Sequence, residues 1–132
     1  MSVFTDSEIA YMTEQKLGRL ATVGPNGKPH VVPVTFRYNP TTDTIDIGGH
    51  DFPTRKKWRD VQQSGLAAFV IDDVLPPWKP RMIEVRGRAE TLDEGGREIM
   101  NEFSPEIIRI HPERIVSGGI ADGQFSARTV GS

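Results

Sequence analysis

The spacing of apolar and polar residues predicts a chain built mainly of short β-strands. Apolar residues alternate with polar ones, or run unbroken, in short stretches that turn-forming residues separate. The clearest turn is Gly24-Pro25-Asn26-Gly27, because Asn-Gly tolerates the positive φ of a tight hairpin. The expected strands span residues 19–23, 30–38, 44–49, 66–71 and 81–90, with a final broken strand at 107–112 and 114–117. The proline-rich residues 72–80 are expected to form a loop.

Three helices are predicted between these strands. Residues 5–14 begin with Thr5 and carry Glu8 three positions later, which is the spacing of a capping box. Residues 54–63 contain no glycine or proline, and we expect Thr54 to cap them and Trp58 and Val61 to face the core. A helix around residues 95–103 is weaker, because two glycines stand at its start.

Six short strands joined by turns predict a mainly β protein, a small antiparallel barrel with flanking helices. We expect residues 1–132 to form a single domain, in which the Gly- and Ser-rich residues 118–132 are a mobile tail. A barrel of this size has little interior space. A large ligand would therefore lie outside the barrel or in a groove between subunits.

Pro33 lies inside the second expected strand, where it cannot donate a ladder hydrogen bond. That strand must therefore be unpaired on one side at Pro33, or bulged there. A gap in backbone pairing is a place where a ligand can approach.

Composition excludes several kinds of site. The chain has no cysteine, which removes disulfides, thiolate metal sites and cysteine nucleophiles, and its three histidines are too scattered to predict a metal site. The net charge of −2 argues against a nucleic-acid-binding protein. No apolar run is long enough to cross a bilayer, and the N-terminus lacks a secretory signal, so we expect a cytoplasmic protein.

Positive charge is concentrated in one place, at Arg55, Lys56, Lys57 and Arg59. Acidic residues are favoured in the first turn of a helix, whereas cations there oppose the helix dipole. The cluster therefore indicates an anion, such as a phosphate or a string of carboxylates, bound at the helix start. The alternative, a solvated helix face, stays open on this pattern alone.

Several stretches together resemble the pyridoxamine 5′-phosphate oxidase-like superfamily of FMN-binding split barrels. They are GRLATV at residues 18–23, GKPHVVPV at 27–34 and TRKKWRDV at 54–61. The branch that uses the deazaflavin coenzyme F420 is the most similar, since DDV at 72–74, IEVRGRAE at 83–90 and IHPERIVS at 110–117 also resemble it.

The resemblance implies a six-stranded antiparallel split β-barrel that forms a homodimer, with coenzyme sites at the subunit interface. It implies that Thr54, Arg55, Lys56 and Lys57 hold the coenzyme's phosphate and acidic tail. Residues lining its rings would be Pro33, Val34, Gly49 and His50, with Trp78 and Lys79 nearby, reaching in from the other subunit. One departure is Gly118, where the family usually has a tryptophan; its loss would widen the groove or loosen the tail.

The implied activity is hydride transfer between F420 and an unsaturated or quinone-like small molecule. The coenzyme carries this chemistry, so no catalytic side chain is assigned. Two alternatives stay open: an FMN-dependent oxidoreductase on the same fold, and a non-catalytic carrier of F420 or a flavin.

Overall fold

The computed structural model describes residues 1–121 and 123–130. Its elements, in chain order, are α1 (Asp6–Glu14), β1 (Leu17–Val23), β2 (Pro29–Asn39), β3 (Thr44–Gly48), the 3₁₀ helix η1 (Phe52–Thr54), α2 (Lys56–Ser64), β4 (Leu66–Leu75), β5 (Lys79–Leu92), α3 (Gly96–Ile99), β6 (Ile107–Gly118) and β7 (Phe125–Thr129). None of the described helices is both long and apolar enough to span a membrane.

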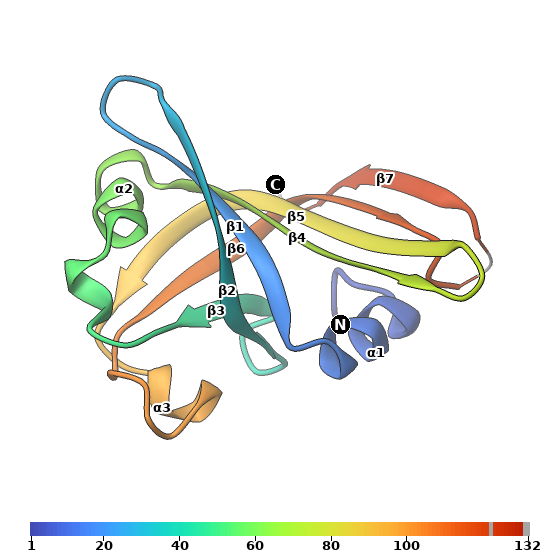
Figure 1. Ribbon diagram of the computed structural model, residues 1–132, viewed down its shortest axis with the longest axis horizontal. Helices are drawn as coiled ribbons and strands as arrows, with labels where there is room; N and C mark the ends of the chain where they lie inside the picture. The colour runs from blue at the N-terminus through green and yellow to red at the C-terminus, as the bar shows by residue number, and fades with distance from the viewer. Residues whose placement is uncertain (122, 131–132) are drawn as a thin grey trace.

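The strands form one antiparallel sheet that closes into a barrel. Its order is β3-β2-β1-β4-β5-β6-β7, and an additional pairing of β3 with β6 closes the first six strands of that order on themselves. Strand β7 continues the sheet beyond β6, outside the closed barrel (Figure 1). The interior is filled by large aliphatic and aromatic side chains, among them Ile47, Phe69, Ile83 and Ile115, which are almost fully buried. The predicted split-barrel fold is confirmed.

Helix α1 begins as its sequence predicts. The Thr5 hydroxyl accepts a hydrogen bond from the Glu8 N–H at 3.1 Å, and the Glu8 carboxylate accepts one from the Thr5 N–H at 2.9 Å. Both bonds of the capping box are therefore present.

Helix α2 differs from its prediction at its start. It begins at Lys56 with Arg55 as the N-cap residue, so the expectation that Thr54 caps it is wrong. Thr54 instead ends η1, and its hydroxyl donates to the Asp51 carbonyl at 2.7 Å. Trp58 and Val61 are buried, as expected.

Residues 72–80 form the end of a hairpin rather than a long loop. Strands β4 and β5 stay paired through Leu75↔Lys79, so only three residues connect them. An ion pair of 2.6 Å between Asp73 and Arg81, which are cross-strand partners, supports the extended ladder. The hairpin projects well beyond the barrel (Figure 1).

The C-terminal region also contains more structure than its composition indicates. Strand β6 runs without interruption, and the break expected near residue 113 is a register shift opposite Arg86 and Gly87. Strand β7 lies within the segment expected to be mobile and pairs with β6 from Arg114↔Thr129 to Gly118↔Phe125. Residue 122 and residues 131–132 of that segment lie outside the described residues.

The other helix prediction is only partly right. Helix α3 is a single turn, and Met100 leaves it with an extended backbone. A Cβ on Gly96 would collide with the backbone of Ser104 and approach that of Glu106, so close packing of the following segment fixes this turn.

Candidate functional site

The barrel is split beyond the end of β3, where β2 stays paired with β1 but has no described strand on its other side. Strand β2 pairs with β1 from Pro29↔Val23 to Thr35↔Leu17, but pairs with β3 only from Thr35↔Gly48 onward. Pro33 therefore has a partner on β1, Arg19, and none on its other side among the described residues. This confirms the expected one-sided pairing at Pro33.

A hollow of about 280 Å³ opens at this split. We call it the β2–α2 hollow. It is lined by Pro33, Val34, Thr35, Gly48, Gly49, His50, Phe52, Arg55, Lys57 and Phe103. Six residues chosen from the sequence are thus brought together: Pro33, Val34, Gly49, His50, Arg55 and Lys57.

Two cations at one side of the β2–α2 hollow have no anionic partner within residues 1–121 and 123–130. Arg55 Nε donates to the His50 carbonyl at 3.1 Å, and the Lys57 ammonium lies 5.5 Å from the centroid of the Phe52 ring. Neither side chain forms an ion pair with any described residue. Burial, and secondarily the nearby charge of Arg55, lowers the pKa of Lys57. The hollow therefore carries uncompensated positive charge that favours an anion.

Lys56, between these two cations, does not line the hollow. Its Nζ lies 3.0 Å from Asp60 Oδ1, on the side of the β1–β2 turn, where Gly24 is its neighbour. Asp60 is buried and also accepts a hydrogen bond of 2.9 Å from the Thr22 hydroxyl. The carboxylate of Asp60 thus largely compensates the charge of Lys56.

Three other predicted residues also lie outside the hollow. Thr54 is exposed and bonded to its own turn. Trp78 and Lys79 stand at the tip of the β4–β5 hairpin, at the opposite end of the molecule from α2 (Figure 1), and Trp78 is 76% exposed. These two side chains therefore cannot contact a ligand in the β2–α2 hollow of the same chain.

Sequence reasoning missed the segment that holds the hollow in shape. The Ser104 hydroxyl donates to the Gly49 carbonyl at 3.0 Å and accepts from the Phe52 N–H at 3.2 Å. Phe103 stacks edge-on against His50, with ring centroids 5.2 Å apart. A Cβ on Gly48 would lie 2.8 Å from the Phe103 ring, so only glycine permits this close approach. Phe103 and Ser104 are distant in sequence from the basic cluster and match no motif, so no local pattern identifies them.

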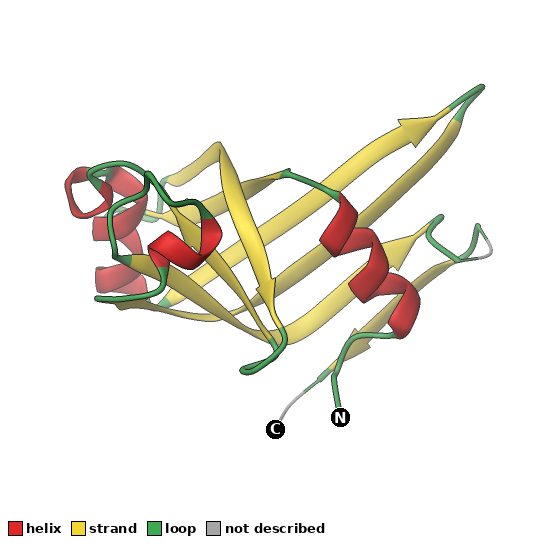
Figure 2. Cartoon of the chain, turned by 90° about the horizontal axis from the view of Figure 1, so that it is seen from below, coloured by secondary structure: helices red, strands yellow, loops and turns green. Residues whose placement is uncertain are grey.

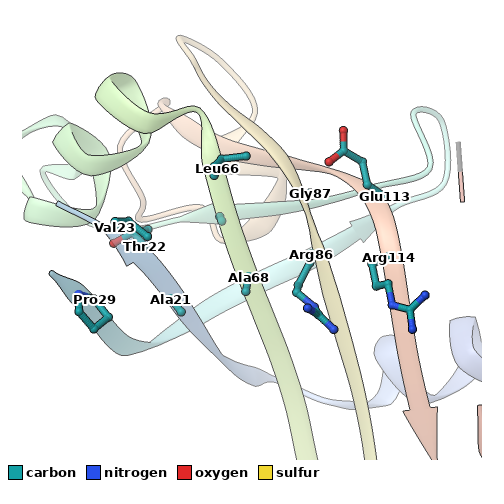
Figure 3. Close-up of a pocket in the computed structure, with 11 residues that line it drawn as sticks. Ala21, Thr22, Val23, Pro29, Leu66, Ala68, Arg86, Gly87, Glu113 and Arg114 are labelled. Atoms are coloured by element: carbon teal, nitrogen blue, oxygen red, sulfur yellow. The ribbon is translucent and has the colours of Figure 1, made fainter. Parts of the chain in front are cut away.

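The outer face of the barrel carries a second hollow, of about 390 Å³ (Figure 3). Ala21, Ala68, Arg86 and Arg114 line it and form a row of cross-strand neighbours, which Val31 continues on β2. Val23 and Leu66 also line the hollow. We call these seven residues the outer face. Its centre is apolar and exposed, with Val31 66% and Leu66 56% accessible, and the two arginines stand side by side at its edge (Figure 3).

The histidines and acids do not form a metal centre: no group of three His, Asp or Glu side chains within residues 1–121 and 123–130 lies close enough to hold an ion.

Comparisons with known proteins agree with this architecture. A family model described as pyridoxamine 5′-phosphate oxidase matches residues 5–123. A 5a,11a-dehydrotetracycline/5a,11a-dehydrooxytetracycline reductase of Streptomyces rimosus is 45% identical over 125 residues, covering 93% of this chain and 87% of that protein.

Solved structures share the fold at lower identity. A heme-binding protein from Mycobacterium smegmatis aligns with a TM-score of 0.70 and 18% identity over 93% of this chain, which spans only 55% of that protein. A pyridoxamine 5′-phosphate oxidase-related, FMN-binding protein from Nostoc punctiforme aligns with a TM-score of 0.59 and 14% identity, over 89% of this chain and 87% of that one.

Proposed function

The chain belongs to the pyridoxamine 5′-phosphate oxidase family, and from that premise we propose that it is an oxidoreductase that reduces a conjugated small molecule with a flavin-type coenzyme bound in the β2–α2 hollow. The relative from Streptomyces rimosus, similar over nearly the whole chain, is named as a reductase of such a molecule.

One observation carries the proposal. Arg55 and Lys57 line the same hollow as the unpaired stretch of β2 at Pro33 and the close backbone at Gly49. A coenzyme with a planar ring system and an anionic tail needs both features together: backbone and apolar surface against the ring, and cations at the tail. The residues present fit such a group.

We propose F420 as the coenzyme, with FMN as the alternative. FMN offers one phosphate, whereas F420 carries a phosphate followed by several carboxylates. Arg55 and Lys57, which form no ion pair with a described residue, favour the more highly charged tail, although Lys56, the third cation expected to contribute, is held by Asp60. Any preference of the site for F420 over FMN therefore depends on the charges of Arg55 and Lys57.

The residues of the chain would bind and orient rather than react. Arg55 and Lys57 would hold the tail, and Pro33, Val34 and Gly49 would position the ring. When bound, the reduced coenzyme supplies a hydride to one carbon of a conjugated double bond. The other carbon would take a proton from solvent, which would complete a two-electron reduction of the double bond. The site's remaining task is to hold donor and acceptor carbons about 3–3.5 Å apart.

We further propose that the protein acts as a homodimer joined through the outer face. Val31 and Leu66 expose apolar surface there, and small residues such as Ala21 and Ala68 keep the face flat enough for a second copy. Pro33 follows Val31 by two positions on the same side of β2, so dimerisation would bring the coenzyme hollow to the subunit boundary. Trp78 and Lys79 could then reach it only from the partner copy.

Titration of the purified protein with F420 and with FMN, followed by turnover with the reduced form of each, tests the proposal. We expect F420 to bind at least 10-fold more tightly and to support reduction of 5a,11a-dehydrooxytetracycline or another conjugated enone. Tighter binding of FMN would reverse the choice of coenzyme. Tight binding of either coenzyme without turnover of enones or quinones would make the protein a carrier.

A further inference from the structure

A larger hollow, of about 600 Å³, lies between α1, β2 and α3. Figure 2 shows α1 and α3 on opposite sides of β2, which forms the floor between them. The apolar residues Ile9, Met12, Phe36, Tyr38, Pro40, Ile99 and Met100 line it, together with the polar or charged residues Thr13, Gln15, Lys16, Thr35, Arg37 and Glu98. We call it the α1–α3 groove.

The α1–α3 groove adjoins the coenzyme hollow. Thr35 lines both. The segment after β5 also contributes to both, because Ile99 and Met100 line the groove and Phe103 lines the hollow. Strand β2 rises about 3.3 Å per residue, so the positions from Pro33 to Arg37 span about 13 Å. A ring over Pro33–Thr35 and a molecule over Thr35–Tyr38 would therefore meet at Thr35.

The surface of the groove indicates the kind of molecule it takes. Ile9, Tyr38 and Ile99 are partly exposed in the groove, and Met100 is 42% exposed at its edge, so flat apolar groups find apolar surface to contact. Lys16 forms no ion pair with a described residue, and Arg37 is only loosely paired, with 3.8 Å between its Nη1 and Glu98 Oε2. Two cations against one carboxylate favour a ligand with an anionic edge.

We propose that the α1–α3 groove is the acceptor site and that it binds a planar, polycyclic, conjugated molecule with an ionised enol or carboxylate at one edge. The inference rests on the proposed function and adds to it the place and class of the acceptor. A volume of about 600 Å³ suits a four-ring molecule. The β2–α2 hollow, at about 280 Å³, has no room for such a molecule beside the coenzyme ring.

The deciding experiment fills the groove without touching the coenzyme hollow. Met100→Trp places a larger side chain at the groove edge, and Arg97→Trp is the matched control, since Arg97 is exposed in the adjoining helix α3 and does not line the groove. Oxytetracycline serves as the probe, and calorimetry measures its affinity for each variant without coenzyme. We expect Met100→Trp to weaken binding at least 10-fold and Arg97→Trp to change it less than twofold.

A second variant tests the charge of the groove. We expect Lys16→Gln to weaken oxytetracycline binding about threefold to 10-fold at low salt, and the loss to shrink as salt is raised. In turnover of 5a,11a-dehydrooxytetracycline with reduced F420, we expect KM to rise most in Met100→Trp, less in Lys16→Gln and least in Arg97→Trp. The Kd for F420 should stay unchanged within twofold in all three variants.

The outcomes separate the groove from the redox function. Loss of oxytetracycline affinity in Met100→Trp, with no turnover by the wild type, would support the groove as a binding site and refute the proposed reaction. Turnover with an unchanged KM in Met100→Trp would support the proposed reaction and refute the groove as the acceptor site. Equal losses in Met100→Trp and Arg97→Trp, or no binding of oxytetracycline by the wild type, would also overturn the assignment.

Discussion

Lys56 and Lys57 are adjacent in the chain, yet their ammonium groups lie in different surroundings. Lys56 Nζ is 3.0 Å from a carboxylate oxygen of Asp60. Lys57 instead lines the β2–α2 hollow, and among the described residues its charge meets the Phe52 ring, with the centroid 5.5 Å away, and no carboxylate. The pair therefore offers two nearly identical substitutions with different expected effects.

Lys57→Gln should weaken F420 binding while Lys56→Gln should not. A charge-assisted hydrogen bond contributes about 1.5–3 kcal/mol, so we expect a loss of about 10-fold to 100-fold at low salt for Lys57→Gln. Fluorescence titration at rising salt should show that loss shrinking, because the charge is only partly buried. Equal losses in both variants would mean that the cluster acts as general positive charge and not through the hollow.

For stability the expectation is reversed: Lys56→Gln should destabilise the fold, and Lys57→Gln should not. Lys56→Gln removes an ion-pair partner of the buried Asp60, but Thr22 still donates to that carboxylate. Because Lys56 is half exposed, we expect a loss of only about 1 kcal/mol in the free energy of unfolding. Urea denaturation should show this loss, with Lys57→Gln as the control that leaves the unfolding midpoint in place.

Acid should weaken the ion pair of 2.6 Å that joins Glu8, in α1, to Arg128, in β7. Although burial alone would raise it, hydrogen bonds from Arg128, the Thr5 N–H and Ser117 lower the pKa of Glu8 below its ordinary value. The stabilisation by Glu8 is therefore complete above its unfolded pKa of about 4.3 and is lost as pH falls through its folded pKa.

Glu8→Gln should consequently lower stability at neutral pH by about 1–3 kcal/mol and flatten the dependence of unfolding free energy on pH below about 4.5. Thermal or urea unfolding between pH 3 and pH 7 provides the measurement. Glu94→Gln changes an exposed carboxylate for which no described ion pair exists, and should leave the pH profile unchanged. A wild-type slope in Glu8→Gln would assign the acid sensitivity to other carboxylates.

Gly48→Ala should disturb the coenzyme hollow through Phe103. The added Cβ would lie 2.8 Å from that ring and 3.1 Å from Ile99, and we expect a destabilisation of about 1–3 kcal/mol and weaker coenzyme binding. Phe103→Leu in the same chain should recover part of both losses, because the smaller side chain leaves room for the Cβ. Additive losses in the double-mutant cycle would contradict a contact between the two residues.

Leu66→Asp should separate the proposed homodimer. Leu66 is exposed in the outer face, so the folded subunit should tolerate the charge, whereas a buried interface should not. Light scattering should show a change from dimer to monomer, and Ala10→Asp on the exposed side of α1 should have no such effect. A wild-type protein that is monomeric at micromolar concentration would exclude the dimer.

Sequence patterns predicted the elements that depend on near neighbours. The capping box at Thr5 and Glu8, the turn at Asn26-Gly27 and the one-sided strand at Pro33 each involve residues a few positions apart. The barrel could be predicted because apolar and polar residues alternate within short stretches that turn-forming residues separate.

The errors arose where distant residues decide the structure. Asp73 and Arg81 extend β4 and β5 into residues that prolines marked as a loop. Strand β7 depends on its ladder with β6, and the Phe125 ring covers Gly118, in the space that a side chain at that position would occupy. Phe125 thus fills this space from the opposite strand, a tertiary contact that no local pattern around position 118 indicates.

The site was predicted in part for the same reason. The basic cluster showed where positive charge gathers, but the choice between Lys56 and Lys57 depends on Asp60, which lies one helical turn beyond Lys56. Phe103 and Ser104 reach the hollow only through tertiary packing, so neither could be chosen from a local motif.

The one-sided pairing of β2 also bears on how the protein avoids aggregation. An unpaired strand edge is a template on which a strand from another molecule can add. Here Pro33, within the exposed stretch, has no N–H to donate, so a continuous intermolecular ladder cannot form across it. The proline that leaves the edge accessible to a small molecule therefore also protects the empty protein from growing into fibres through that edge.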